Sequence, residues 1–212
     1  MALALATTVA AAGCSKPDPA PAPAPSASAA DPAPSAAPSA AVIAMPAASA
    51  APLPNRTDCP KGSAGPGTFD KPCVGKGPTR LMEATWTGKS DDKGPQLRVV
   101  NKSPLVILYG KIAVYFYDKA GKQLDVKEPD DTKTHPYKTC SGVSLFGGVM
   151  KAGEKAVLSF SCVRKESVPE GTVAMEGEVQ SVGFSDASEK KSEFYWKNDD
   201  LVMDVRKKGG LK

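Results

Sequence analysis

The stretch LVILYGKIAVYFYD, residues 105–118, decides the fold class of this chain. Its side chains alternate with the period of two residues that is typical of a β-strand, and both resulting faces are apolar or aromatic. The faces are Val106, Leu108, Ile112, Val114 and Phe116 on one side, and Ile107, Tyr109, Tyr115 and Tyr117 on the other. A strand that is apolar on both faces is typical of the middle of a buried sheet.

Shorter segments with the same alternation lie on both sides of this strand. They are LMEATWT (81–87), PQLRVVN (95–101), KAVLSFSCV (155–163), TVAMEGEVQSVGFSD (172–186), EFYW (193–196) and DLVMDV (200–205). The apolar phase shifts by one residue between Val179 and Val182, which predicts a bulge near Gln180 or Ser181. No segment keeps a helical period. Short strands separated by turn residues predict an all-β, antiparallel β-sandwich over residues 81–205.

Two stretches resemble the bacterial FxLYD-type immunoglobulin-like domains. They are VVNKSPLVILYGKIAVYFYDKAGKQL (99–124) and KAGEKAVLSF (151–160). The matching residues are Asn101, Phe116, Tyr117, Asp118, Gly121, Gly153 and Glu154. The resemblance implies an immunoglobulin-like sandwich outside the cytoplasm and implies no activity. The chain departs from the family in its extra cysteine pairs and in the insertion EPDDTKTHPYKTC, residues 128–140.

The N-terminal residues predict an export signal. Residues 1–13 carry no charge and are rich in Ala, Leu and Val, as the apolar part of a signal peptide is. A basic region is missing before them, so we expect either that the natural start lies upstream or that the sequence is trimmed at its start. The following AAGC, residues 11–14, resembles the lipobox of bacterial lipoproteins, which implies a lipid anchor on Cys14. Ser15 implies the outer membrane by the sorting rule of enteric bacteria. The alternative is an ordinary secretory signal followed by a chance cysteine.

A tract of Ala, Pro and Ser follows over residues 17–54. Proline removes backbone donors, and small side chains bury too little apolar surface to offset the entropy of ordering. We therefore expect residues 14–54 to be a lipidated cysteine followed by a disordered stalk. At ~3.1 Å per residue its reach would be on the order of 100 Å. It is either a tether of required length or a passive spacer.

Four cysteines remain after Cys14, namely Cys59, Cys73, Cys140 and Cys162. Four cysteines allow three pairings, and we favour the two closest in sequence. The first pair would staple a loop-rich segment, residues 55–80, that is dominated by Gly and Pro. A zinc site is the competing interpretation, but the chain has no CxxC spacing and its single histidine, His135, has only Cys140 nearby.

The charge pattern argues against a nucleic-acid partner. The net charge is +4, with 27 basic and 23 acidic residues. Their signs are mixed along the chain, and no run forms a basic stripe. The C-terminal RKKGGLK, residues 206–212, is predicted to be a solvated basic tail. A weak attraction to anionic surfaces remains compatible with this charge.

Residues with catalytic chemistry are few. The insertion places His135 near Asp130 and Asp131, a combination that could serve acid–base catalysis beside a nucleophile. The chain lacks the GxSxG, HExxH and SxxK patterns, so we expect no catalytic residue, no metal and no cofactor. A cell-wall hydrolase that uses this cluster is the alternative function. The acidic pairs 91–92, 130–131 and 199–200 lack the spacing of a calcium loop and are interpreted as turn residues.

The face formed by Ile107, Tyr109, Tyr115 and Tyr117 is the candidate binding surface. Exposed aromatic patches mark sites for glycans or protein partners. The alternative is that a second sheet, the N-terminal loop or a neighbouring strand covers the face. The expected function is that of a membrane-anchored lipoprotein of the bacterial cell envelope. It would act as a non-catalytic binding or structural module whose partner is an envelope protein or a glycan.

Overall fold

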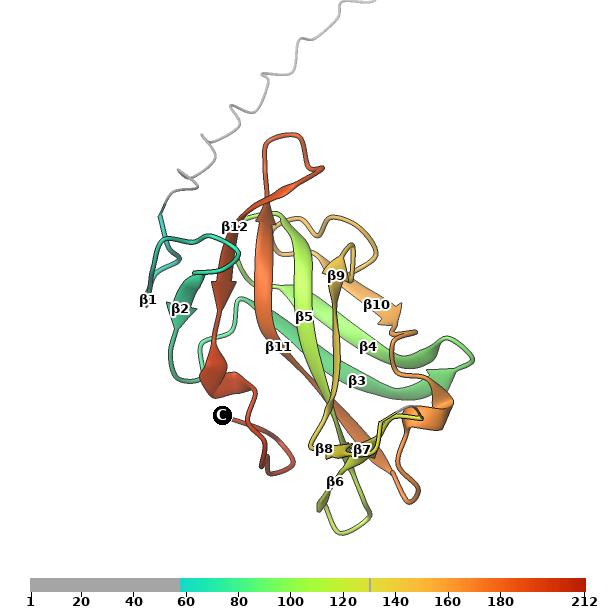
Figure 1. Ribbon diagram of the computed structural model, residues 1–212. Helices are drawn as coiled ribbons and strands as arrows, with labels where there is room; N and C mark the ends of the chain where they lie inside the picture. The colour runs from blue at the N-terminus through green and yellow to red at the C-terminus, as the bar shows by residue number, and fades with distance from the viewer. Residues whose placement is uncertain (1–57, 130) are drawn as a thin grey trace, which may run out of the picture. The chain divides into compact units, whose positions relative to one another are not determined.

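A computed structural model describes residues 58–129 and 131–212 (Figure 1). The predicted signal peptide, Cys14, the stalk and Asp130 lie outside the described residues. The described chain consists of strands and two short 3-10 helices, which confirms the all-β prediction. The strands are β1 (Ser63–Ala64), β2 (Cys73–Gly75), β3 (Met82–Asp91), β4 (Gly94–Asn101), β5 (Ile107–Tyr117), β6 (Gln123–Leu124), β7 (Val126–Lys127), β8 (Thr134–His135), β9 (Lys138–Val143), β10 (Lys155–Ser159), β11 (Ala174–Ser185) and β12 (Ser192–Lys197), and the helices are η1 (Lys165–Ser167) and η2 (Asp199–Leu201).

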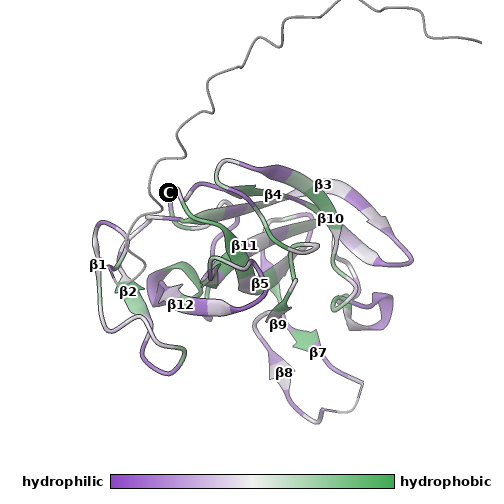
Figure 2. Cartoon of the chain, turned by 90° about the horizontal axis from the view of Figure 1, so that it is seen from above, coloured by the Kyte–Doolittle hydropathy of each residue, from purple (hydrophilic) through white to green (hydrophobic). Residues whose placement is uncertain are grey.

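Two sheets form the predicted sandwich. The large sheet has seven strands in the order β1-β2-β12-β11-β5-β6, and β9 also pairs with β5. The small sheet has the order β10-β4-β3, and β7 with β8 forms a separate ribbon. Seen from above, β3, β4 and β10 lie on one side of the molecule, and β12, β5 and β9 on the other (Figure 2). All pairs are antiparallel except β2 with β12.

The core lies between the sheets and contains the alternating residues that the sequence predicts. Leu97 and Val99 on β4 are fully buried, and Met82 on β3 is nearly so. They belong to one apolar cluster with the inward side chains of β5, β11 and β12, namely Ile112, Val114, Phe116, Val179, Val182, Phe184, Phe194 and Trp196. Burying each such side chain contributes roughly 1.5–3 kcal/mol.

Two compensating bulges shape the pairing of β5 with β11. Val179 faces Ile112 while Ser181 faces Lys111, so Gln180 is the extra residue. This confirms the bulge predicted from the apolar phase. A second shift lies further along, where Gly183 pairs with Tyr109 but Phe184 pairs with Ile107. It brings Ile107 into the main core.

Three expectations about individual segments are wrong. The segment DLVMDV is not a strand, because it begins with η2 and continues as irregular chain. The strand predicted over 155–163 ends at Ser159, where Phe160 begins a turn. Residues 206–212 are not a solvated tail, because Arg206 is only 6% exposed and Leu211 packs against the core. Ion pairs within the fold satisfy the buried charge of Arg206.

The expected disulfides are both present, between Cys59 and Cys73 and between Cys140 and Cys162. The first closes the loop that leads into β2, and segment 58–80 belongs to the same compact unit as the sandwich. The second joins β9 of the large sheet to the chain that follows β10 of the small sheet. Within residues 58–129 and 131–212, no helix has the length and apolarity needed to cross a membrane.

Candidate functional site: the outer face of the large sheet

The C-terminal segment covers part of the outer face of the large sheet. Tyr115 and Tyr117 of β5 point to this face, and both are fully buried. The Tyr115 hydroxyl donates to the Met203 carbonyl and accepts from the Met203 amide, each at 3.1 Å. The guanidinium carbon of Arg206 lies 4.8 Å from the centroid of the Tyr115 ring.

The predicted surface of Ile107, Tyr109, Tyr115 and Tyr117 therefore does not form. The second bulge turns Ile107 into the core. Tyr115 and Tyr117 are fully buried, and Tyr137 packs against them together with Val202 of the C-terminal segment. Tyr109 alone of the four remains partly exposed. A strand pattern predicts which residues share a face, but it cannot predict that a segment from the other end of the chain lies over that face.

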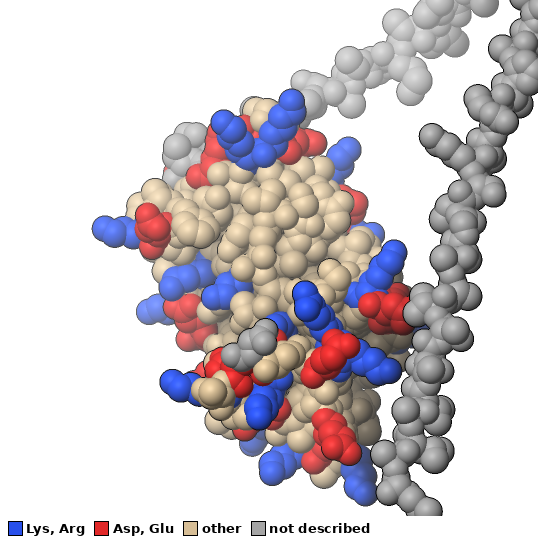
Figure 3. Space-filling model, turned by 45° about the vertical axis from the view of Figure 1, so that its right-hand side comes forward, with Lys and Arg blue, Asp and Glu red and all other residues tan. Residues whose placement is uncertain are grey.

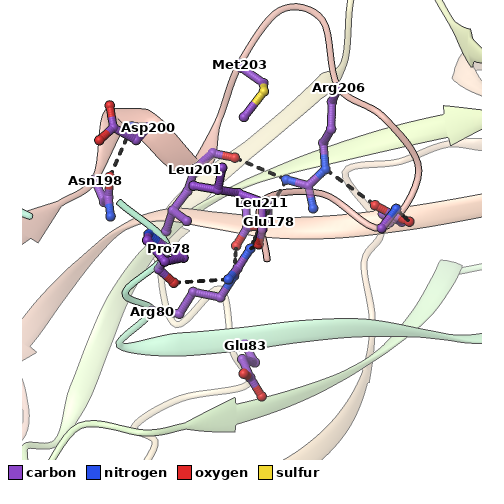
Figure 4. A network of polar contacts seen from close by, with 12 residues as sticks. Pro78, Arg80, Glu83, Glu178, Asn198, Asp200, Leu201, Met203, Arg206 and Leu211 are labelled. Atoms are coloured by element: carbon purple, nitrogen blue, oxygen red, sulfur yellow. Dashed lines mark hydrogen bonds and ion pairs between the residues drawn. The ribbon is translucent and has the colours of Figure 1, made fainter. Parts of the chain in front are cut away.

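Glu178 of β11 holds the C-terminal segment in place (Figure 4). Its carboxylate accepts two hydrogen bonds from Arg80, at 2.9 and 2.8 Å, and one from Arg206 at 2.9 Å. Arg80 also donates to the carbonyl of Leu211 at 2.5 Å. Arg206 donates to the Leu201 carbonyl at 3.1 Å and lies 3.4 Å from the carboxylate of Glu176. The network joins β11, the chain before β3 and the last residues of the protein.

The charges in this network stabilise one another. Burial opposes the charge on Arg206, but the charge and hydrogen bond of Glu178 outweigh it and raise the pKa of the guanidinium above its ordinary value. Burial raises the pKa of Tyr115 well above its ordinary value, and burial together with the charge of Glu176 raises the pKa of Tyr117 to about 12. The charged groups thus bind each other and hold the C-terminal segment against the sheet.

The predicted acid–base pair forms but is exposed. His135 Nε2 lies 2.8 Å from Asp131 Oδ2, and both side chains are well exposed at the β7–β8 ribbon. Hydrogen bonds from His135 and from the amide of Lys133 lower the pKa of the Asp131 carboxyl. Asp131 thus closes the turn of the ribbon. An exposed pair of this kind has ordinary solvation, whereas catalytic acids and bases are usually found in sheltered sites.

Asp91, Asp199 and Asp200 of the remaining acidic pairs bind groups of the protein, some in their own turns and some in other parts of the fold. Asp91 accepts hydrogen bonds from the amide of Lys93 and from Gln96 and Ser159. Asp199 pairs with Lys197 at 3.0 Å, and Asp200 accepts from the amide of Gly77 at 2.8 Å. In the part of the chain that the structure describes, no three His, Cys, Asp or Glu residues gather where they could hold a metal ion.

A cluster of three rings occupies the uncovered part of the outer face. Phe69, Tyr109 and Tyr195 meet edge to face, with ring centroids 5.2 to 6.0 Å apart. The sequence alone does not reveal this cluster, because its members come from the first disulfide loop, β5 and β12. One signal for Phe69 was present in the sequence. It is a phenylalanine in a loop of Gly, Pro and polar residues between Cys59 and Cys73.

Neither a family model, nor a curated protein, nor a solved structure gives a match to this chain. The fold class therefore rests on the structure itself, which is an all-β sandwich with a C-terminal segment packed on its large sheet and a partly exposed ring cluster.

Proposed function

We propose that the chain is a lipoprotein of the bacterial cell envelope whose sandwich is a non-catalytic binding or structural module. Cys14 would carry the lipid that anchors it, most simply in the outer membrane. The residues before Cys14 and the Ala-Pro-Ser tract after it support the anchor and the stalk. The similarity of residues 99–124 and 151–160 to FxLYD-type domains supports an immunoglobulin-like module outside the cytoplasm.

The pair of disulfides is the observation that carries this proposal. All four cysteines of the described chain are bridged, and one bridge ties the two sheets together. Structural disulfides form and persist in oxidising compartments such as the periplasm and the cell surface. Export is thereby supported by residues far from the N-terminus. The ring cluster on the outer face supports a binding role, because exposed aromatic patches mark interaction sites.

The intact mass of the protein, extracted with detergent from its native membranes, tests the anchor. We expect a chain that begins at Cys14 and carries acyl groups, and a gain of four hydrogens on reduction of the two disulfides. A Cys14→Ser variant should leave the membrane fraction, whereas the neighbouring Ser15→Ala variant should stay there. A native mass without acyl groups, or four free thiols before reduction, would refute the proposal.

Incubation of the purified chain with cell-wall polymers tests the non-catalytic part. We expect no release of soluble fragments. Release that is abolished by His135→Ala, and retained by the matched ribbon variant Thr134→Ala, would instead establish the hydrolase alternative.

A further inference from the structure

Four strands of the large sheet place residues of their outer face in one apolar row. Val143 of β9 pairs with Tyr109 of β5, Tyr109 pairs with Gly183 of β11, and Gly183 pairs with Tyr195 of β12. Residues that are directly paired across a sheet share a face. Phe69 lies against both tyrosine rings and is 62% exposed, and Val143 is 64% exposed. We call these five residues the aromatic row.

Gly183 allows the aromatic row to close. A Cβ atom at this position would lie 2.8 Å from Tyr109 Cβ and 2.8 Å from Tyr195 Cε1. Such distances do not occur between real side-chain atoms, so any other residue would push the rings apart. With glycine between them, the ring centroids of Tyr109 and Tyr195 approach to 5.8 Å. Together with Phe69 they form a continuous aromatic platform.

A polar row runs beside the platform, two residues further along each strand. Its members, paired in the same way, are Ser141 of β9, Lys111 of β5, Ser181 of β11 and Lys197 of β12. All four lie on the same face as the aromatic row, because side chains two residues apart on a strand point the same way. Each strand therefore offers a polar group next to an apolar one.

The charges around this surface cancel. Lys197 pairs with Asp199 at 3.0 Å, and Gln180 donates to the same carboxylate at 3.4 Å. A surface depression extends along the three rings, and Lys111 and Asp70 both line it. These two side chains carry opposite charges. Residues 141–150, which include Val143 at the end of β9, contain no charged residue. In Figure 3 a broad area without charged residues lies in the upper half of the domain, and charged side chains surround it at the top rim and below.

The sheet leaves no free backbone edge beneath Tyr109, Gly183 and Tyr195 of the aromatic row. β5 lies between β9 and β11, and β11 lies between β5 and β12. On the far side of β12, the amide of Tyr195 donates to the carbonyl of Gly67 at 2.8 Å. An extended peptide could therefore not add to β5, β11 or β12 here through main-chain hydrogen bonds, which is how many peptides bind sheets. Among the described strands β9 pairs with β5 alone, so its other edge borders the row only at Val143.

We propose that the aromatic row and the polar row together bind a neutral oligosaccharide. A sugar ring has an apolar C–H face that fits an aromatic ring, and a rim of hydroxyl groups that fits the serine, lysine and glutamine side chains. Its lack of charge matches the cancelled charges of the surface. This inference rests on the proposed role as a binding module and adds its site and ligand class.

The test uses the full chain with Cys14→Ser, so that no lipid takes part. The probes are the β-1,4-linked tetrasaccharides of N-acetylglucosamine and of glucose. Binding is followed by calorimetry and by tryptophan fluorescence, since Trp196 lines the same depression. We expect saturable binding that Phe69→Ala and Tyr195→Ala each weaken about tenfold, which corresponds to the loss of one aromatic contact. Tyr195→Phe keeps the ring and should bind within about twofold of the parent.

The control is Val157→Ala, an exposed apolar residue on β10 of the other sheet, which should not change binding. Near-ultraviolet circular dichroism establishes that each variant is folded. Absence of saturable binding of both probes would overturn the inference, as would binding that Phe69→Ala and Tyr195→Ala leave unchanged. Capture of an envelope protein or of lipid vesicles by this surface, without sugar binding, would also overturn it. Acylation of Cys14 is measured separately, so failure of the sugar test leaves the anchor proposal standing.

Discussion

At the scale of single residues, Glu178 is the group on which the buried charges depend. Replacing it with alanine leaves the guanidinium of Arg206 buried, with Glu176 at 3.4 Å as its remaining anionic partner. Removing one member of a buried ion pair costs about 3–5 kcal/mol. We therefore expect Glu178→Ala to lower the free energy of unfolding by that amount, measured by urea denaturation.

The matched control is Glu83→Ala, since Glu83 forms an ion pair with Lys102 in which both side chains are well exposed. Exposed pairs contribute roughly 0–1 kcal/mol. Equal effects of the two substitutions would show that the Arg80–Glu178–Arg206 network does not stabilise the fold.

Tyr117 makes the stability of the protein sensitive to alkaline pH. Burial raises its pKa to about 12 in the folded state, whereas a tyrosine of the unfolded chain ionises near pH 10. Between these two values the unfolded state loses a proton that the folded state keeps, so the free energy of unfolding falls as the pH rises. Its slope should approach about 1.4 kcal/mol per pH unit for one tyrosine.

Urea denaturation at pH 8 and over pH 10–12 measures this slope. We expect Tyr117→Phe to make the slope over pH 10–12 shallower. At pH 8, below the range in which tyrosine ionises, the substitution should change the free energy of unfolding by an amount that does not depend on pH. The fully disulfide-bonded Cys14→Ser chain is the appropriate background, because it has no free thiol to react at high pH. Parent and variant curves of the same slope would contradict the prediction.

At the scale of elements, the last seven residues act as part of the sandwich. Truncation after Val205 removes the cation that lies over the Tyr115 ring and the amide of Gly209 that donates to Glu176 at 2.6 Å. It also leaves Glu178 with Arg80 alone. We expect a loss of about 3 kcal/mol or more in the free energy of unfolding, together with weakened near-ultraviolet circular dichroism from Tyr115.

A substitution of Lys207 and Lys208 by glutamine is the control for this truncation. Both side chains are exposed, so the substitution lowers the charge of the segment and leaves its buried contacts in place. A truncated chain with the stability and spectrum of the parent would mean that the segment does not contribute to the fold.

The contrast between β11 and the C-terminal segment shows which elements a sequence can predict. The bulge at Gln180 was predictable, because a change in apolar phase along one strand is a local feature. The bulge that displaces Ile107 was not, because it depends on how β5 meets β11. The burial of Arg206 depends on Arg80 and Glu178, which are far away in sequence, and a basic sequence looks the same whether its charges are solvated or paired.

The same distinction holds for the candidate site. Alternation identified Tyr109 as an outward residue, and the cysteine spacing identified the loop that carries Phe69. Their meeting with Tyr195 required the parallel pairing of β2 with β12, which brings the first disulfide loop beside the sheet. Local patterns thus give the members of a surface, and the order of strands decides which members become neighbours.

At the scale of the whole molecule, the two disulfides have different tasks. Cys140 lies on β9 of the large sheet and Cys162 follows β10 of the small sheet, so their bond links the two layers across 22 residues. Cys59 and Cys73 close a loop of 14 residues at the end of the large sheet. Chain entropy alone would make each bond contribute roughly 3 kcal/mol, since the two loops are similar in length.

We expect the double variants to separate these tasks. Replacing Cys140 and Cys162 by serine should lower the free energy of unfolding of the whole sandwich by about 2–4 kcal/mol. Replacing Cys59 and Cys73 should mainly free the loop that carries Phe69. Its remaining backbone links to the sheet are then the two-residue pairing of β2 with β12 and the hydrogen bond from the Tyr195 amide to Gly67. Amide hydrogen exchange distinguishes the two results. The variant without Cys140 and Cys162 should exchange faster throughout the core. The variant without Cys59 and Cys73 should exchange faster only in residues 59–75 and in the facing part of β12. A uniform increase in both variants would instead show that the loop is an integral part of the core, and that the aromatic row is held as rigidly as the sheet beneath it.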